Sequence, residues 1–494
     1  MLFNKSSLYY ANEIKNGNMS VLELTERTLQ LIDQYNPELD AVIDRFDQYA
    51  LDKARTYDKK LQEMHVDERK SLPPFFGVPL LLKDIGQHLE GTVNSSGSKL
   101  RKGLKAHFTD NSIRLAEDAG FIFVGRSNIP EYGLKIVSDS PYYGKVKNPV
   151  DLTRNPGGSS GGASAAVKAG IVPLATASDA GGSIRVPASD TGLIGLKPSR
   201  GRVAEGPGFY RPVNGMSTNL VVSKTVDETF EYLKAVQLYQ SSHPYRLKEI
   251  KEKTIEPLGK PLKIGVYTNE PLGRTMKPEA KETLEKTTQI LKDLGHEVEI
   301  IDLDVNFKEV QHYYYQTMTV ETGRLVLELE TQAQEIHFED VDPLTWATYK
   351  IAPLIPATDY ARMTQWIDKT TEYMEELFND IDVLLTPTAS DVAAKNEDLD
   401  YSSSMLEQIK NITEQENPFE VVKQAFDFYY QRGPYSQLFN FTGQPALSLP
   451  IYENKAGLPL GSQFVAPRGQ EYLLLQLAKQ IEDAGELKTE IVEL

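Results

Sequence analysis

Two segments rich in glycine and serine contain the residues whose chemistry stands out in this sequence. In "NPGGSSGGASAAVKAG", Ser159 and Ser160 lie between pairs of glycines. In "SDAGGSIRVPAS", Ser183 follows two glycines and lies 24 residues after Ser159. A serine hydroxyl becomes a useful nucleophile when a neighbouring base removes its proton. The rest of the chain must therefore supply a base and a scaffold that brings the two segments together.

The first segment is not typical of a linker or of a phosphate-binding loop. A flexible linker would stay polar, whereas Ala163 to Val167 are small and mostly apolar. A P-loop needs a lysine at a fixed distance from its glycines, and a dinucleotide-binding fingerprint needs G-x-G-x-x-G at the start of a helix. Neither pattern occurs here. The glycines are expected to let the backbone approach another part of the molecule closely, next to a tightly packed helix.

The second segment has adjacent backbone N–H groups that could converge on one point. Ala180, Gly181, Gly182 and Ser183 follow one another, and the glycines allow backbone conformations that other residues avoid. A concave set of N–H groups binds anions, and beside a serine it indicates an oxyanion hole. An ordinary tight turn remains the alternative at this point.

The base for a serine nucleophile is usually histidine, but no histidine here lies in a triad context, and G-x-S-x-G is absent around Ser183. Lysine can replace histidine when burial lowers its pKa and keeps it neutral. Lys83 follows the apolar run Val78 to Leu82, which predicts a buried strand. A surface ion pair with Asp84 is the alternative for Lys83. We expect most of the histidines to lie at the surface or in packing roles; they are His65, His88, His107, His243, His296, His312 and His337.

Amphipathic helical patterns alternate with short apolar runs along the chain, which indicates an α/β fold. Ser20 and Glu23 form a capping-box pattern at the start of one helix. The sequence predicts one large domain over residues 1–494, with a helical insertion at about 305–430 that shapes the substrate pocket. Other expected elements are a helix over 47–64, a helix ending at Gly120 followed by a strand over 121–124, a strand–helix–strand unit over 263–303, a helix over 359–378, a strand over 382–388, and two strands and a closing helix after residue 439.

Composition restricts the partners and the location. The formal net charge of −17 disfavours direct binding to nucleic acid or to anionic membranes. The chain has no cysteine, so thiolate chemistry and disulfides are excluded. No H-E-x-x-H pattern occurs, and no cofactor or metal is expected. The N-terminal segment lacks the apolar core of a signal peptide and no window is apolar enough to span a membrane, so a cytoplasmic location is expected.

Taken together, the motifs resemble the amidase signature family. The resemblance extends over most of the chain and includes "GVPLLLKD", "VGRSNIPEYG", "GLKPSRGRV", "DVLLTPT" and "FNFTGQPALSLP". It implies a large mixed β-sheet core covered by helices on both faces. It also implies a Ser–cis-Ser–Lys triad in which Ser183 is the nucleophile, Ser159 the bridging serine after a cis peptide bond, and Lys83 the base.

The resemblance assigns further roles around these three residues. The N–H groups of Ala180, Gly181, Gly182 and Ser183 would form the oxyanion hole. Ser160 would support the loop by hydrogen bonding. An ion pair between Asp179 and Arg185 would hold the loop in place, and a substrate carboxylate on Arg185 is the alternative. Many relatives carry Thr or Gly at the position of Ala180; because the role uses the backbone N–H, Ala is expected to be tolerated.

The activity implied is hydrolysis of a carbon–nitrogen amide bond, other than a peptide bond, in a linear or cyclic small molecule through an acyl-enzyme. Within the family the chain is most similar to stand-alone amidases of the 6-aminohexanoate-cyclic-dimer hydrolase type. Tyr132 and the aromatic run His312 to Gln316 are expected near the pocket, with helix packing as the alternative for the aromatic run. An apolar or aromatic amide would then be the substrate.

Two other functions fit the same residues. The first is the glutamine-hydrolysing A subunit of a tRNA-dependent amidotransferase, in which partner subunits would contact the RNA. The second is a non-catalytic amide-binding protein, which the intact Lys83, Ser159 and Ser183 disfavour. The oligomeric state is open, and a homodimer is one option.

Overall fold

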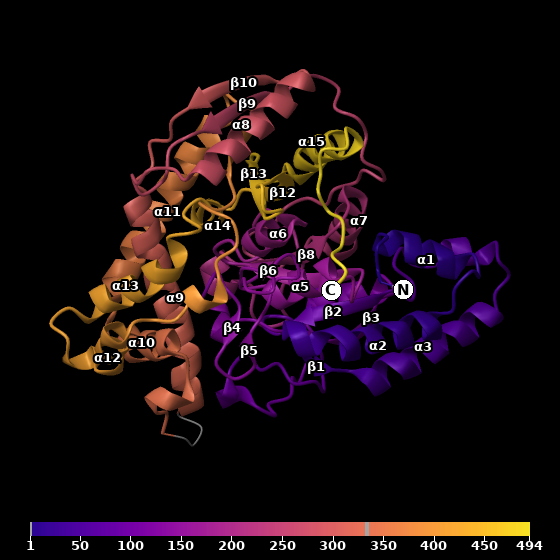
Figure 1. The fold of residues 1–494 in the computed structure, drawn as a ribbon, viewed down its shortest axis with the longest axis horizontal. Helices are drawn as coiled ribbons and strands as arrows, with labels where there is room; N and C mark the ends of the chain where they lie inside the picture. Colours follow the sequence, from indigo (N-terminus) through magenta and orange to yellow (C-terminus); the bar gives the residue numbers. More distant parts are fainter. Residues whose placement is uncertain (1, 331–334) are drawn as a thin grey trace.

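The computed structural model describes residues 2–330 and 335–494, and in this part of the chain thirteen strands and fifteen α-helices alternate (Figure 1). The strands are β1 Val42–Arg45, β2 Pro79–Lys83, β3 Ile122–Ser127, β4 Asp139–Ser140, β5 Gly144–Lys145, β6 Leu174–Asp179, β7 Ile194–Lys197, β8 Thr218–Ser223, β9 Lys263–Tyr267, β10 Glu297–Ile301, β11 Val383–Pro387, β12 Ala446–Glu453 and β13 Pro459–Val465. The α-helices are α1 Ser7–Lys15, α2 Val21–Leu39, α3 Asp47–Gln62, α4 Asn111–Asp118, α5 Gly161–Lys168, α6 Arg185–Thr191, α7 Val226–Val236, α8 Pro278–Asp293, α9 Phe307–Glu330, α10 Pro343–Ile351, α11 Ala357–Leu377, α12 Ser403–Lys410, α13 Pro418–Tyr430, α14 Gln437–Thr442 and α15 Glu471–Asp483.

Eleven of these strands form one mixed sheet through the middle of the molecule. Their order is β1-β3-β2-β6-β8-β7-β12-β13-β11-β9-β10, and β4 and β5 pair separately. The segments β3-β2-β6 and β11-β9-β10 are parallel, whereas the strands between β6 and β11 pair antiparallel. Helices cover both faces of the sheet (Figure 1). The predicted fold, a large mixed sheet between helices, is confirmed.

Strand β2 carries the residue of greatest chemical interest at its C-terminal end. All five of its residues, including Lys83, are buried, and parallel partners β3 and β6 flank it. An apolar run with both faces covered by other elements is the usual composition of such a strand. The predicted strand over 78–82, with Lys83 at its end, is therefore confirmed within one residue.

The N-terminal helices follow the local signals of the sequence. Ser20 is the N-cap of α2, and its hydroxyl accepts a hydrogen bond of 3.2 Å from the Glu23 N–H. One face of this helix packs inward, with Leu29 and Ile32 buried. Helix α3 begins at Asp47 as expected. Figure 1 shows α1 to α3 together on one side of the molecule.

The region over residues 305–430 contains helices α9 to α13 and also the central strand β11. Strand β11 pairs in parallel with β9 and antiparallel with β13, so this region returns to the sheet before it ends. Helices α9 to α13 lie together on the side of the molecule away from α1 to α3 (Figure 1). Within residues 2–330 and 335–494, no helix has both the length and the apolarity to cross a membrane.

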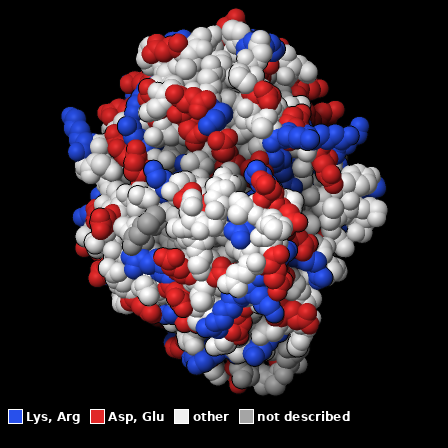
Figure 2. All heavy atoms as spheres, turned by 90° about the vertical axis from the view of Figure 1, so that its right-hand side faces the viewer, with Lys and Arg blue, Asp and Glu red and all other residues white. Residues whose placement is uncertain are grey.

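Acidic and basic side chains are intermixed on the face shown in Figure 2. No broad basic area, of the kind that binds a phosphate backbone, covers this face. The visible surface therefore agrees with the charge of the sequence.

Close backbone contacts explain the glycine run that precedes α5. A Cβ at Gly158 would lie 2.5 Å from the Val137 carbonyl. A Cβ at Gly162 would lie 2.5 Å from both the Asn128 nitrogen and the Ala41 carbonyl oxygen. The run is therefore a packed wall rather than a flexible linker, because only glycine leaves room for these neighbours.

This packing predicts a large difference between two glycine-to-alanine substitutions. Gly162→Ala forces a methyl group into two backbone segments, and overpacking of this kind costs about 1–3 kcal/mol of stability. Gly259→Ala is the control, because a Cβ there meets nothing within 4 Å. Urea unfolding should show a clearly lower midpoint for Gly162→Ala only. Equal midpoints for the two variants would contradict the close packing.

Candidate active site

Lys83 is buried next to Ser159. Its ammonium nitrogen donates a 2.8 Å hydrogen bond to the Ser159 hydroxyl and a 3.1 Å hydrogen bond to the Ser178 carbonyl. The side chain is fully buried. Burial lowers the pKa of Lys83 to about 7, although the Asp179 carboxylate acts in the opposite direction. A substantial fraction of this lysine is therefore neutral near pH 7 and able to accept a proton.

The alternative partner Asp84 turns away from Lys83. Its carboxylate accepts 3.0 Å hydrogen bonds from the Ser95 and Gly97 N–H groups and another from the Ser95 hydroxyl. It also lies 3.9 Å from the Arg126 guanidinium. The surface ion pair between Lys83 and Asp84 that the sequence left open is therefore not formed.

The Gly/Ser loop brings Ser159 and Ser160 against the second motif. The peptide bond between Gly158 and Ser159 is cis. The Ser160 hydroxyl donates a 2.5 Å hydrogen bond to the Ser183 carbonyl, while the Ser159 hydroxyl accepts from Lys83. Both motifs therefore meet directly, through main-chain and side-chain contacts.

Ser183 lies between the end of β6 and the start of α6 and lines the same cavity as Ser159. It is 4% exposed, so little more than its cavity side is accessible. The Ser183 and Ser159 hydroxyls make no hydrogen bond with each other in this structure. Catalytic hydrogen bonds in a ligand-free enzyme are often long and tighten when substrate binds.

The four predicted N–H donors of the loop are not equivalent. The Gly182 N–H donates a 2.7 Å hydrogen bond to Asp179 Oδ1, so it is already used. Gly182 must therefore be removed from the predicted oxyanion-hole donors. The N–H groups of Ala180, Gly181 and Ser183 have no acceptor among the described residues and stay in the predicted set.

A buried ion pair fixes the loop that carries Ser183. The Arg185 guanidinium donates two hydrogen bonds to Asp179, of 2.8 and 2.9 Å, and both side chains are inaccessible to solvent. Burial alone would raise the pKa of Asp179, but the Arg185 charge and hydrogen bonds from Arg185 and Asn440 hold it well below its usual range. The ion pair implied by the resemblance is therefore present.

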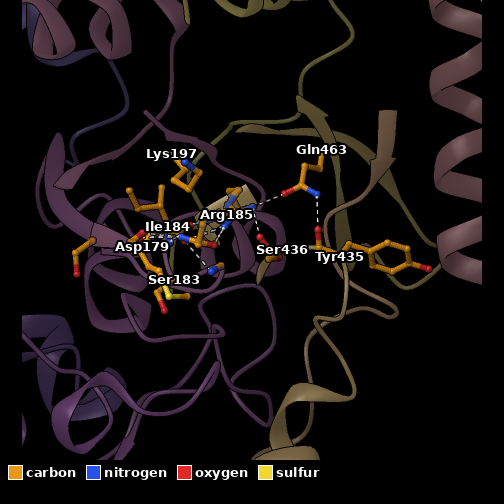
Figure 3. Close-up of polar contacts among 12 residues, drawn as sticks. Asp179, Ser183, Ile184, Arg185, Lys197, Tyr435, Ser436 and Gln463 are labelled. Atoms are coloured by element: carbon orange, nitrogen blue, oxygen red, sulfur yellow. Dashed lines mark hydrogen bonds and ion pairs between the residues drawn. The ribbon is translucent and has the colours of Figure 1, made fainter. Parts of the chain in front are cut away.

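The other guanidinium donors of Arg185 are also occupied. Arg185 Nη1 donates to the Ser436 carbonyl at 3.0 Å and to Gln463 Oε1 at 2.7 Å, and Gln463 in turn donates to the Tyr435 carbonyl at 3.1 Å (Figure 3). Arg185 Nη2 also donates to Asn440 Oδ1 at 2.7 Å. A substrate carboxylate on Arg185, the alternative role, is excluded because Arg185 is buried behind the loop and does not line the cavity.

The cavity in front of Ser183 has a volume of about 270 Å³. Much of its wall is apolar, and several charged side chains lie within it. Its walls come from the loops around β2 and β3, from the two serine motifs, from residues 205–219, and from α9. The apolar side chains include Ile85, Phe108, Tyr132, Pro207, Phe209, Val213, Met318 and Leu325.

Tyr132 lies in the cavity wall, as predicted, with a left-handed backbone (φ 51°). The aromatic run His312 to Gln316 does not line the cavity. Tyr314 instead packs behind the loop from Ala180 to Ser183, where a Cβ at Gly181 would lie 2.3 Å from the Tyr314 hydroxyl. Helix packing, the alternative given for this run, is therefore its role, and later turns of the same helix face the cavity.

Several cavity residues were not singled out from the sequence. His88, expected among surface or packing histidines, lines the cavity and contacts Asp110 with its Nδ1 at 3.0 Å. Glu205 and Arg101 also lie in the wall. These side chains come from separate loops, so no local spacing in the sequence predicts that they share a cavity. The position of Glu205 shortly after "GLKPSRGRV" is the only sequence signal that could have found it. Among the described residues, no group of three or more His, Asp or Glu side chains is placed to hold a metal ion.

Comparison with known proteins shows what the whole chain is similar to. The family model described as Amidase matches residues 23–475. A lipoamidase of Enterococcus faecalis is 32% identical over 99% of this chain, and the chain spans 64% of the length of that relative. A 6-aminohexanoate-cyclic-dimer hydrolase of Paenarthrobacter ureafaciens is 29% identical over 96% of this chain and 93% of its own length.

Solved structures share the fold. The structure of a 6-aminohexanoate cyclic dimer hydrolase in complex with substrate superimposes with a TM-score of 0.85 at 27% identity, covering 98% of this chain and 97% of that chain. The similarity therefore includes the whole sheet and the helices around the cavity, rather than the serine motifs alone.

The buried ion pair predicts an unequal effect of two carboxylate-to-amide substitutions. Asp179→Asn leaves the Arg185 charge buried and uncompensated, which should cost about 3–5 kcal/mol of stability. Asp67→Asn, which removes the exposed partner of Lys70, should change stability by less than about 0.5 kcal/mol. Urea unfolding of both variants checks this. A loss for Asp179→Asn no larger than that of the control would show that the pair does not stabilise the loop.

Proposed function

This chain belongs to the amidase signature family and is an amide hydrolase acting on carbon–nitrogen bonds other than peptide bonds, and we propose that it works through a relay of Ser183, Ser159 and Lys83. The observation that carries the proposal is the 2.8 Å hydrogen bond from a buried Lys83 to Ser159, at the edge of the cavity that also exposes Ser183.

In the acylation step, the Ser183 hydroxyl attacks the carbonyl carbon of the bound amide. Its proton passes to Ser159, whose own proton passes to the neutral amine of Lys83. Ser183 has to turn toward Ser159 in the substrate complex, because the two hydroxyls are not hydrogen-bonded to each other in this structure. The products of this step are a tetrahedral oxyanion on Ser183 and an ammonium on Lys83.

The free N–H groups of Ala180, Gly181 and Ser183 are the proposed donors to the oxyanion. Collapse of the intermediate breaks the carbon–nitrogen bond, and Lys83 returns a proton through Ser159 to the leaving amine. Water then attacks the acyl ester of Ser183, with the same relay accepting and returning a proton. The enzyme ends the cycle unchanged, so no cofactor is required.

An amide with an apolar portion is the proposed substrate class. The apolar side chains that line the cavity support this, because a small charged amide would leave them in contact with water. Similarity to cyclic-dimer hydrolases, over nearly the full length of both chains, supports including cyclic amides with linear ones.

Covalent labelling tests the nucleophile without knowledge of the substrate. A fluorophosphonate probe should form a single adduct on Ser183, identified by mass spectrometry of the intact and digested protein. Ser183→Ala should abolish labelling and lower amide turnover by at least about 10³-fold. Lys83→Ala should slow labelling strongly while the protein stays folded. Full turnover by Ser183→Ala, or an adduct on another serine, would reject the mechanism.

The lowered pKa of Lys83 predicts how the rate of the same reaction depends on pH. Only the neutral amine accepts a proton, and burial lowers the pKa of Lys83 to about 7. The neutral fraction should therefore rise from about one tenth at pH 6 to about nine tenths at pH 8. The labelling rate and kcat/KM should rise in the same range. If the labelling rate and kcat/KM rose only near pH 10, where ordinary lysines titrate, Lys83 would not be a base with a lowered pKa.

A further inference from the structure

Glu205 places a carboxyl group in the wall of the cavity that contains Ser183. The residue is partly buried, and its carboxylate makes no hydrogen bond and no ion pair with any described residue. The neighbouring cavity residues Phe108, Pro207 and Phe209 are apolar. A carboxyl group that has left much of its water, without a protein partner, is costly unless a ligand supplies one.

The backbone of Glu205 is held firmly in this position. Its N–H donates to Gln240 Oε1 at 2.8 Å, and its carbonyl accepts from Gln240 Nε2 at 2.9 Å and from Asn111 Nδ2 at 2.7 Å. The adjacent Gly206 carbonyl accepts from the Asn111 N–H at 2.8 Å. The loop is therefore anchored on both sides, and only the carboxyl group of Glu205 is left without a partner.

Among the described residues, no charged side chain of the cavity wall pairs with the Glu205 carboxylate. Asp110 accepts from the His88 N–H at 2.7 Å and contacts His88 Nδ1 at 3.0 Å. Arg101 donates through its Nε to the Asn94 carbonyl at 3.2 Å, Arg324 pairs with a glutamate on its own helix, and neither forms an ion pair with the Glu205 carboxylate. Burial and the negative charge of Asp110 raise the pKa of Glu205 well above its ordinary value. No protein cation compensates the carboxylate.

We propose that Glu205 binds a cationic amine carried by the substrate, so that the preferred amides bear an ammonium group at the end of an apolar chain. This inference rests on the proposed amide hydrolysis. An ammonium group would supply the missing charge and hydrogen-bond donors, and the methylene groups that lead to it would contact Phe108 and Phe209. Glu205 is thus a specificity-determining residue, and it takes no part in the proton relay.

Matched amides that differ only in a terminal group test this role. The hexanoyl amide of cadaverine has the shape of the hexanoyl amide of hexylamine, with ammonium in place of methyl. The ε-aminohexanoyl amide of hexylamine is matched in the same way by the heptanoyl amide, with the ammonium on the acyl side. We expect kcat/KM to be at least about tenfold higher for the ammonium member of one of these pairs.

Glu205→Gln should remove this preference, because it keeps the shape of the side chain but cannot become a carboxylate when an ammonium group binds. Turnover of the neutral amides should change little. Glu321→Gln is the matched control: Glu321 also lines the cavity, but its carboxylate already accepts a 3.4 Å hydrogen bond from Tyr360. This variant should keep the preference for ammonium.

Three outcomes would overturn the proposal. They are the absence of a preference for ammonium in both pairs, an unchanged preference in Glu205→Gln, and an equal loss of kcat/KM for the neutral and the ammonium-bearing amides in that variant. Failure of amide hydrolysis itself is distinguishable. In that case none of the four amides is hydrolysed and the fluorophosphonate probe leaves Ser183 unlabelled. If only the role of Glu205 is wrong, Ser183 is still labelled and the neutral amides are still hydrolysed.

Discussion

Keeping one lysine out of water is the constraint on which the rest of the site depends. Lys83 ends a strand that is buried on both sides, and the partners of its nitrogen are a hydroxyl and a carbonyl without formal charge. A carboxylate in direct contact would hold the proton on the lysine, because an opposite charge favours the ammonium form. The adjacent Asp84 is instead bound by Ser95 and Gly97. The fold thus separates this lysine from the anion next to it in sequence.

A second constraint shapes the loop around that lysine. The segment from Ala180 to Ser183 belongs to no helix or strand, so nothing regular fixes its direction. The Asp179 carboxylate fixes the direction of this segment. It accepts one hydrogen bond from the Gly182 N–H and another from the Arg185 side chain. Removing both charges from water is expensive, and the two-pronged geometry of the guanidinium offsets that cost. Electrostatics therefore fix this loop together with the packing of Tyr314 against Gly181.

The sequence predicted the elements with a strong local pattern and the residues with a recognisable spacing. Strand β2, helix α2 and the positions of Lys83, Ser159 and Ser183 follow from such signals. The use of the Gly182 N–H by Asp179 could not be predicted, because the direction of an N–H depends on backbone angles. Glu205 was missed since its anchors, Asn111 and Gln240, are distant in the chain. Side chains gathered from separate loops leave no periodicity to detect.

Helix α9 connects two parts of the enzyme that are otherwise distinct. One of its turns places Tyr314 behind Gly181, with its hydroxyl 2.7 Å from that of Tyr430, and later turns place Met318 and Leu325 in the cavity wall. Evolution toward new substrates would act on the later turns, yet any shift of the helix axis would also move the support of the loop that carries Ser183. Mutations here should show epistasis, so that altered selectivity needs compensating changes at the tyrosine pair.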